Sequence, residues 1–561
     1  MRKNNGKYKE YIRIFVMAAI IVAITGFPYI KEGLCAYFPD LMYHMLRTEG
    51  VKEALLEGNF PARIYMNFYN GYGYGSPLFY PDIFLIIPAM LRIANIQPLH
   101  VWKVFALLLT AISTLTTYFS IKYISKDSET SIAATFMIML SQFYLADLHL
   151  RAGISEYMAF IFIPVLIAGI YDFFVYEGKK TYLMGIAFVG LLLSHSIMTF
   201  IGILITIVIF VRMIFVKKKN GYLFDRQRML RLVITAMCTV LLTSYYWLPM
   251  LEQMSVLDLG YSQPWAHIGK YTQPFSSFFS LVGHFSTIAY TGIGIPILPL
   301  ALLCVFLKKP ENRWSSAFLM TGIFLYLITT KIIPWNILEN TPLNMIQFTY
   351  RFWPYAQFFV VLGITLILSK HLNGLGMRYK RVVLLGIIGC AILAGAFQNR
   401  MTAWVTSEDT RKITDEYLLE NSNYVGAGEW LPLNISENVT NLKATQYVTS
   451  SRGESQQFVK EYDSFSFYTR ENAESYTIPL IYYKGYSAWI ESDDGIKEEM
   501  QIVESEDGLL QVINQTGASA KVYVKYTGTI LQKVSMAVTV VTMTILITFY
   551  VLRKLTKKNK G

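Results

Sequence analysis

The chain opens with the apolar run IFVMAAIIVAITGFPYI (residues 14–30), and YFPDLMYHMLRTEGVKEALLEGNFPARIYMNFYNGYGYGSPLFYPD (residues 37–82) follows it. The first stretch approaches the length of a membrane-spanning helix. It is longer than a usual signal-peptide core and lacks a convincing cleavage site, so we predict an uncleaved first helix. The second stretch concentrates an acid, a histidine, an arginine and a loop rich in glycine and tyrosine. This composition is typical of a functional site, here placed at a membrane surface.

The composition excludes an ordinary soluble enzyme. Of 561 residues, 53% are hydrophobic and only 16% are charged, with a mean hydropathy of +0.37, whereas about a quarter of the residues in soluble proteins are charged. The net charge of +12 lies in short clusters between apolar runs, as in cytoplasmic anchors, and does not indicate nucleic acid. The four cysteines have no paired spacing, so the sequence supports neither a disulfide framework nor a zinc site.

The apolar runs predict a multi-pass protein of the plasma membrane with about twelve spans. Basic residues before residue 14 and after residue 552 place both termini in the cytoplasm. The triple lysine at 217–219 places its loop there as well. The segment 83–96 is short and interrupted by proline, so we predict a juxtamembrane or re-entrant helix there. The predicted spans are 14–30, 99–121, 130–146, 157–176, two short helices between 181 and 216, 231–249, 288–307, 314–331, 354–369, 382–397 and 530–552.

The region 398–528 differs from the rest of the chain. It carries 20 acidic and 11 basic residues, and its apolar residues alternate with polar ones as in strands. We therefore predict a polytopic α-helical membrane protein with a small β-rich extracytoplasmic domain. The predicted domains are a transmembrane domain over 1–397 with an outer loop at 31–98, the β-rich domain over 398–528, and a final helix with a basic cytoplasmic tail over 529–561.

The first candidate site residues lie in the opening loop. Asp40 and His44 are four residues apart, so a helix would place them on one face, with Arg47 beside them. Such a group suits a phosphate, a metal ion or an acceptor hydroxyl. The alternative is an interfacial helix in which Asp40 is only an N-cap.

Further candidates come from later outer loops. Arg151 and Glu156 lie five residues apart just before a span, where charges are costly unless they face a cavity or a partner. The alternative is an arginine paired with Glu156 for stability alone. His195 lies in a predicted outer turn, where a histidine is often structural.

Two outer segments before or after spans add charged residues. Glu252 follows an aromatic belt, and Arg351 directly precedes a span, where it suits a lipid phosphate. A surface arginine is the alternative. In the loop NGYGYGSPLFYP (70–81), Tyr72 and Tyr74 lie between glycines that let a backbone approach a ligand, although a flexible interface loop is equally consistent.

The order of these motifs resembles the GT-C superfamily of integral-membrane glycosyltransferases. More narrowly, a set of short motifs occurs in order along the chain: PDLMYHMLR, YGYGSPLFYP, LRAGISEYMAFIFIP, LSHSIMTF, YYWLPMLE, QFTYRFWP and YVGAGEWLP. These motifs are similar to those of the bacterial membrane family labelled 6-pyruvoyl-tetrahydropterin-synthase-related, and they also resemble large membrane proteins linked to lipoteichoic acid glycosylation. No zinc motif of a soluble pterin synthase is visible. The resemblance spans nearly the whole chain.

The resemblance implies transfer of a sugar on the outer face, from a polyprenyl-phosphate donor to a glycan or polymer of the cell envelope. Asp40 matches the first-loop acid, which acts as a base or binds the acceptor or a metal. The resemblance therefore leaves open whether the reaction uses a divalent cation. Glu156 corresponds to the second acid. Arg151 and Arg351 would hold the donor phosphate, and Tyr72 and Tyr74 would stack on the sugar. Beside the donor and the acceptor, membrane lipid is the third expected partner.

Two other functions stay open at this point. In a transporter or flippase for a lipid-linked glycan, the same charges would line a pathway, but we find no internal repeat of the kind that transporters often show. A non-catalytic assembly protein would use its outer domain to bind envelope polymer. An enzyme requires Asp40, Glu156 and Arg351 to converge.

Overall fold

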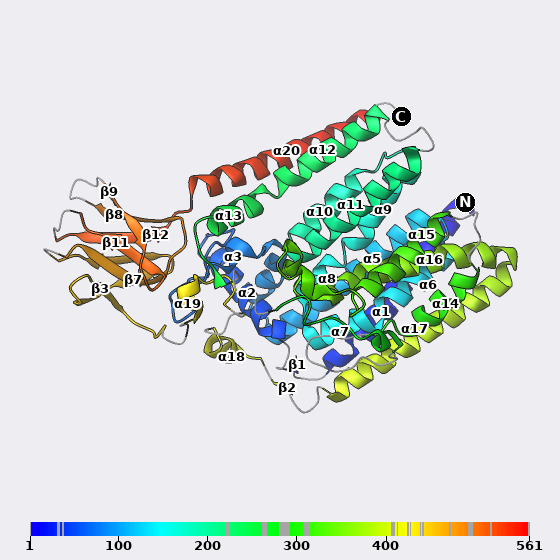
Figure 1. Ribbon diagram of the computed structural model, residues 1–561, viewed down its shortest axis with the longest axis horizontal. Helices are drawn as coiled ribbons and strands as arrows, with labels where there is room; N and C mark the ends of the chain where they lie inside the picture. Colours follow the sequence, from blue (N-terminus) through cyan, green and yellow to red (C-terminus); the bar gives the residue numbers. More distant parts are fainter. Residues whose placement is uncertain are drawn as a thin grey trace. The chain divides into compact units, whose positions relative to one another are not determined.

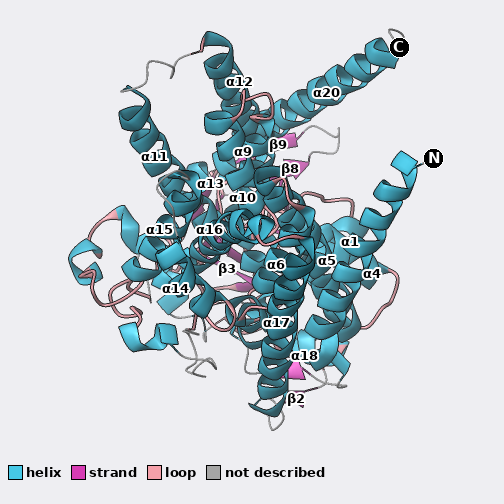
Figure 2. Ribbon diagram, turned by 90° about the vertical axis from the view of Figure 1, so that its right-hand side faces the viewer, coloured by secondary structure: helices cyan, strands magenta, loops and turns pink. Residues whose placement is uncertain are grey.

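Helices make up most of the chain in the computed structural model, and strands form a small part of it (Figure 2). Its residues form two compact units. Unit 1 comprises Met1–Leu41, Gln97–Thr239 and Trp265–Ile413, and unit 2 comprises Met42–Ile96, Val240–Pro264 and Thr414–Gly561. The structure describes residues 2–30, 34–35, 39–218, 225–260, 266–279, 292–307, 313–405, 410–411, 413–422, 426, 428–437, 439, 442–470, 473–491, 497–515 and 519–558.

Unit 1 is a helical bundle with one short strand pair, β1 (Leu34–Cys35) with β2 (Thr410–Arg411). Its helices are α1 (Arg2–Gly26), η1 (Phe27–Ile30), α5 (Pro98–Ser125), α6 (Ser128–Met139), α7 (Gln142–Ala146), the π-helical turn η3 (Asp147–Arg151), α8 (Ile154–Ala159), α9 (Ile163–Val175), α10 (Tyr182–Leu192), α11 (Ser196–Lys218), most of α12 (Arg226–Leu242), η5 (Phe275–Phe279), α14 (Ile297–Leu307), α15 (Arg313–Ile328), η6 (Trp335–Leu338), η7 (Pro342–Ile346), η8 (Thr349–Phe352), α16 (Trp353–Gly374) and α17 (Met377–Val405).

Seven helices among the described residues are long and apolar enough to cross a membrane, or up to nine if each of two bent pairs is one span. The bends measure 43° between α6 and α7 with η3, and 64° between α12 and α13 (Ser244–Met254). Three of the twelve predicted spans correspond to the shorter helices α10, α14 and α15. The membrane class is therefore confirmed, whereas the number twelve stays a prediction. The triple lysine at 217–219 lies partly outside the described residues.

Close helix packing in unit 1 depends on glycine. Helices α15 and α16 run side by side (Figure 1). A Cβ atom at Gly322 would lie 2.6 Å from the carbonyl oxygen of Ala356, and one at Gly363 would lie 2.6 Å from the backbone nitrogen of Leu319. Small residues at such contacts let helix backbones approach, as membrane helices require.

Unit 2 combines the opening loop, the end of the second bent pair and the C-terminal region. Its helices are most of α2 (Pro39–Leu56), α3 (Ser76–Phe79), η2 (Ile83–Leu85), α4 (Ile86–Ile93), α13, α18 (Asp415–Glu420), α19 (Leu433–Glu437) and α20 (Ile530–Lys558). Its strands are β3 (Tyr447–Ser450), β4 (Ser455–Gln457), β5 (Val459–Glu461), β6 (Ser464–Tyr468), β7 (Ser475–Ile481), β8 (Tyr486–Glu491), β9 (Lys497–Met500), β10 (Ile502–Glu504), β11 (Leu509–Ile513) and β12 (Lys521–Tyr526).

These strands form two five-stranded antiparallel sheets, in the orders β10-β11-β7-β3-β4 and β5-β6-β12-β8-β9. Alternate residues of β6, β11 and β12 are buried, as expected for sheets with one covered face. Phe467 of β6 contacts Tyr476 of β7 with ring centroids 5.3 Å apart, so the two sheets share a core. The predicted small β-rich region is confirmed over 447–526, whereas the predicted boundary at 398 falls inside α17.

The loop after α2 packs against the C-terminal region within unit 2. The backbone N–H of Ile481 donates to the carbonyl oxygen of Tyr72 at 2.9 Å, and Phe79 stacks on Trp430 with centroids 5.0 Å apart. The segment 83–96 forms the short elements η2 and α4, and Arg92 at its end pairs with two carboxylates of unit 2. This segment is one of the shorter apolar helices, and its juxtamembrane or re-entrant placement stays a prediction.

Candidate functional site

Six polar side chains from five segments of unit 1 form one network of ion pairs and hydrogen bonds, and we refer to them as the charged cluster. They come from the first turn of α2, the π-helical turn η3, helix α8, the turn between α10 and α11, and the 3-10 helix η8. The residues are Asp40, Asp147, Arg151, Glu156, His195 and Arg351.

Arg151 is the centre of the charged cluster. Its Nη1 atom donates to Oδ1 of Asp147 at 2.7 Å and to Oε2 of Glu156 at 2.6 Å. Its Nη2 atom donates to Oδ2 of Asp40 at 3.2 Å, and its guanidinium lies 4.8 Å from the ring centroid of Tyr350. Three carboxylates therefore share one positive charge, and the contact with Asp40 is the longest of the three.

A second arginine holds the opposite side of Glu156. The Nε atom of Arg351 donates to Oε1 of Glu156 at 2.7 Å, while Nη1 donates to the carbonyl oxygen of Ile346 and to Oε1 of Gln347, each at 2.8 Å. Gln347 has a φ of 61°, an uncommon backbone conformation for a residue other than glycine. The buried carboxylate of Glu156 is thus fixed between two guanidinium groups.

His195 approaches the same carboxylate. Its Nδ1 atom accepts a hydrogen bond from the backbone N–H of Met198 at 3.2 Å, and its Nε2 atom lies 3.7 Å from Oε1 of Glu156. Because Nδ1 is an acceptor, the neutral ring carries its proton on Nε2, which faces Glu156.

The π-helical turn explains how Asp147 and Arg151 come together. Such turns are rare and are frequent at functional sites. The turn ends at Ala152, whose φ of 56° is left-handed, and Gly153 follows. A Cβ atom at Gly153 would lie 3.1 Å from Oδ1 of Asp147, so a larger residue would press on the ion pair.

Asp147 is a site residue that the sequence analysis missed. It is buried, and its Oδ2 atom has no hydrogen-bond partner among the described residues. The available signal was the spacing of Asp147 and Arg151, four residues apart in LADLHLR, which brings an acid and a base together on a helix.

Exposure separates Asp40 from the other acids. Its side chain is 37% exposed, compared with 0% for Asp147 and 2% for Glu156. Partial burial raises the pKa of Asp40, and the nearby Arg151 guanidinium opposes this effect. Asp40 is therefore the carboxylate of the charged cluster that a substrate can reach, and its proton affinity is increased.

The charged cluster does not fit a divalent cation. Oxygen atoms of Asp40, Asp147 and Glu156 all face the Arg151 guanidinium, which takes the place of a shared counter-ion. In the part of the chain that the structure describes, no group of three histidine, cysteine or acidic side chains has the geometry to hold a metal ion.

Two other predicted site residues, His44 and Arg47, lie in the unit 2 part of α2. Arg47 is fully buried, where it pairs with Asp82, donates to the carbonyl oxygen of Pro81 at 2.8 Å, and lies over the Tyr80 ring at 4.2 Å. Its Nη1 atom is 3.1 Å from Nδ1 of His44. These contacts tie α2 to the loop that follows it.

The remaining predicted residues, Tyr72, Tyr74 and Glu252, also belong to unit 2. Tyr74 is fully buried, and the hydroxyl of Tyr72 donates to the carbonyl oxygen of Lys443 at 3.2 Å. Glu252 accepts a hydrogen bond from Thr529 at 2.6 Å and pairs with Lys484. The charged cluster of unit 1 thus contains five of the ten predicted residues, namely Asp40, Arg151, Glu156, His195 and Arg351.

Comparison with known proteins supports the membrane class. No curated protein matches the chain. The family model described as 6-pyruvoyl-tetrahydropterin synthase related domain, membrane protein, matches residues 78–401, which include all of the charged cluster except Asp40. Since this match covers more than half of the chain, the protein belongs to the 6-pyruvoyl-tetrahydropterin synthase related family of membrane proteins.

Proposed function

We propose that the chain is a GT-C-like integral-membrane glycosyltransferase of the plasma membrane. In this proposal it moves a sugar from a polyprenyl-phosphate donor to a cell-envelope acceptor on the outer face. The single observation that carries the proposal is the partly exposed carboxylate of Asp40 beside the otherwise buried ion network of Arg151, Glu156 and Arg351. Burying charged side chains in a membrane protein costs free energy, and such buried charges are typical of functional sites.

Asp40 serves as the general base. Its carboxylate is partly exposed, and burial raises its pKa, which brings a carboxylate closer to the range useful for proton transfer. The Arg151 guanidinium orients it through one hydrogen bond of 3.2 Å.

The reaction needs no strong general acid. The acceptor oxygen forms a bond to the anomeric carbon while its proton passes to Asp40. The bond between that carbon and the phosphate oxygen breaks, and the electron pair leaves with the polyprenyl phosphate, which is a stabilised anion. The proton on Asp40 then returns to water.

The other groups position Asp40 and Arg151. Glu156 and Asp147 hold Nη1 of Arg151 and leave Nη2 directed to Asp40. Because both arginines are already paired with carboxylates, the donor phosphate competes for the weakest contact, that of Nη2. We therefore assign Glu156 a positioning role in place of direct proton transfer.

Transfer by the purified full chain tests the proposal. The chain is reconstituted in liposomes with a radiolabelled polyprenyl-phosphate sugar and envelope acceptor. Asp40→Asn is expected to lower turnover by about 100-fold or more, since a positioned base contributes about 10²- to 10⁴-fold. Asp507→Asn, an exposed carboxylate in the turn after β10, is the matched control. Equal turnover by wild type and Asp40→Asn would remove Asp40 from the mechanism.

A transporter of lipid-linked glycans is the second candidate, because the buried charges lie on candidate spans. The same liposomes separate the two functions. Lipid scrambling without transfer from any donor would favour transport, and neither activity would favour a non-catalytic assembly protein.

A further inference from the structure

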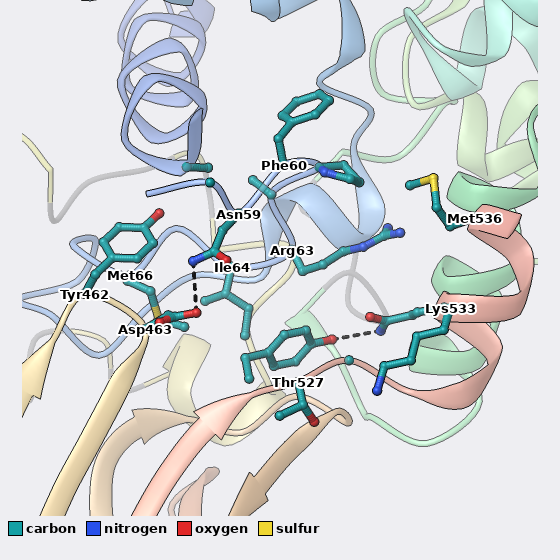
Figure 3. A pocket seen from close by; sticks show the side chains of 17 residues that line it. Asn59, Phe60, Arg63, Ile64, Met66, Tyr462, Asp463, Thr527, Lys533 and Met536 are labelled. Carbon is teal, nitrogen blue, oxygen red and sulfur yellow. Dashed lines mark hydrogen bonds between the residues drawn. The ribbon is translucent and has the colours of Figure 1, made fainter. Parts of the chain in front are cut away.

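A cavity of about 470 Å³ lies in unit 2 beside the start of α20 (Figure 3). Its walls come from residues 54–66, 462–463 and 526–536. Helix α20 contains the candidate membrane span Ile530–Thr556. The cavity therefore lies beside the first residues of a candidate membrane span.

Several polar groups in the wall are already paired with other side chains. Asp463 accepts a hydrogen bond from Asn59 at 2.9 Å and pairs with Lys525 at 3.3 Å. The hydroxyl of Tyr526 accepts from Gln532 at 2.8 Å. A sugar ligand would have to compete for these groups.

Arg63 differs from them. Its Nη2 atom donates to the carbonyl oxygen of Tyr245 at 3.1 Å, and no carboxylate of the described residues forms an ion pair with it. Figure 3 shows its side chain extending toward the part of α20 that carries Met536 and Lys533. Burial lowers the pKa of Arg63, as expected for a cation that has lost water without gaining an anion.

The wall also contains apolar and basic side chains. Phe60, Pro61 and Met536 line the cavity, and Lys533 adds a second cation. Val534, the next residue of α20, is 52% exposed, which suits contact with acyl chains. The cations in the wall suit a phosphate, and the apolar side chains suit a hydrocarbon chain. A ligand that carries both groups therefore fits this cavity.

We propose that this cavity binds the phosphate of an anionic phospholipid, with Arg63 pairing with the phosphate and the acyl chains passing Met536 along α20. Inorganic phosphate shares the headgroup chemistry, but it would leave the apolar wall uncovered. The site does not depend on the proposed sugar transfer.

Native mass spectrometry of the full chain tests this site. The protein is released from nanodiscs made of equal parts phosphatidylglycerol and phosphatidylcholine, and bound lipids are counted. Wild type is expected to retain phosphatidylglycerol preferentially. Arg63→Gln should lower this preference about tenfold, the loss expected for a charge-assisted hydrogen bond, whereas Arg63→Lys should keep part of it. Arg452→Gln, with an exposed arginine in the turn between β3 and β4, should behave as wild type.

Lys533→Gln is a second variant that should leave folding intact, because Lys533 is exposed. We expect it to lower the preference for phosphatidylglycerol two- to threefold. Unchanged lipid preference in a folded Arg63→Gln protein would overturn the proposal. So would displacement of phosphatidylglycerol by millimolar inorganic phosphate with no preference between the two lipids, which would identify a free-phosphate site.

Discussion

Nε of Arg351 donates to Oε1 of Glu156 at 2.7 Å across 195 residues of sequence, and both side chains are buried. The same carboxylate accepts from Arg151 at 2.6 Å. Glu156 therefore joins η3, α8 and η8, and the partly exposed Asp40 contacts this network through Arg151.

Glu156→Gln is expected to destabilise the protein strongly. Removing one partner of a buried ion pair leaves the other charge uncompensated and costs about 3–5 kcal/mol. Here Arg351 loses the carboxylate that it pairs with, and Arg151 loses one of three. The measurement is the thermal unfolding midpoint of the full chain in detergent. Glu177→Gln, an exposed acid, is the control, and an unchanged midpoint for Glu156→Gln would contradict the central role of this carboxylate.

The pH dependence of transfer should report Asp40. Its pKa is raised by burial, and the ionised form is the base, so kcat/KM should be low at acidic pH and rise to a plateau as Asp40 loses its proton. The rise should lie at higher pH than the value of about 3.9 for a free aspartate. The native state binds this proton more tightly than the unfolded chain, so the stability that it contributes is lost as pH rises through the raised pKa.

Substitution of Arg151 tests this assignment. The Arg151 guanidinium lowers the pKa of Asp40 against the effect of burial, so Arg151→Gln should move the rise in kcat/KM to still higher pH, whereas Arg151→Lys should keep it closer to wild type. A profile that falls with pH, or one that Arg151→Gln leaves in place, would show that another group titrates.

The apolar runs predicted the membrane helices well because composition alone determines which segments favour the bilayer. The charged cluster was partly predictable, since Arg151, Glu156 and Arg351 all lie next to apolar runs. Its pairing was not, because Asp40 and Arg151 are 111 residues apart and their contact depends on helix packing. Asp147 was missed because its spacing of four residues from Arg151 does not by itself reveal the π-helical turn that contains both residues.

The opening stretch shows a second limit of sequence reasoning. Asp40, His44 and Arg47 lie on one helix, yet only Asp40 belongs to unit 1. Arg47 pairs with Asp82 inside unit 2. Helical spacing identifies which residues share a face, but it does not reveal which tertiary partners each one finds.

The pair of Arg47 and Asp82 should be essential for stability. Arg47→Met is expected to cost about 3–5 kcal/mol because it leaves a buried carboxylate without its cation. The double variant Arg47→Met/Asp82→Asn should recover part of this loss, since both charges are gone and the introduced amide oxygen would still accept from the Tyr65 hydroxyl that now donates to Asp82. Thermal unfolding of the single and double variants measures the coupling, with the exposed Arg452→Met as control. Purely additive effects would mean that the pair contributes nothing as a pair.

Gly50 in α2 should resist a substitution that normally stabilises helices. Alanine is favoured over glycine in a helix by about 1 kcal/mol, but a Cβ atom at Gly50 would lie 2.3 Å from Cδ1 of Tyr65, whose side chain is fully buried. Overpacking of this kind costs about 1–3 kcal/mol, so Gly50→Ala should lower the unfolding midpoint. Gly386→Ala in α17 is the matched control, because nothing lies within 4 Å of its added Cβ atom, and it should leave the midpoint unchanged or raise it. If both variants raised the midpoint equally, the contact between α2 and Tyr65 would be looser than the structure shows.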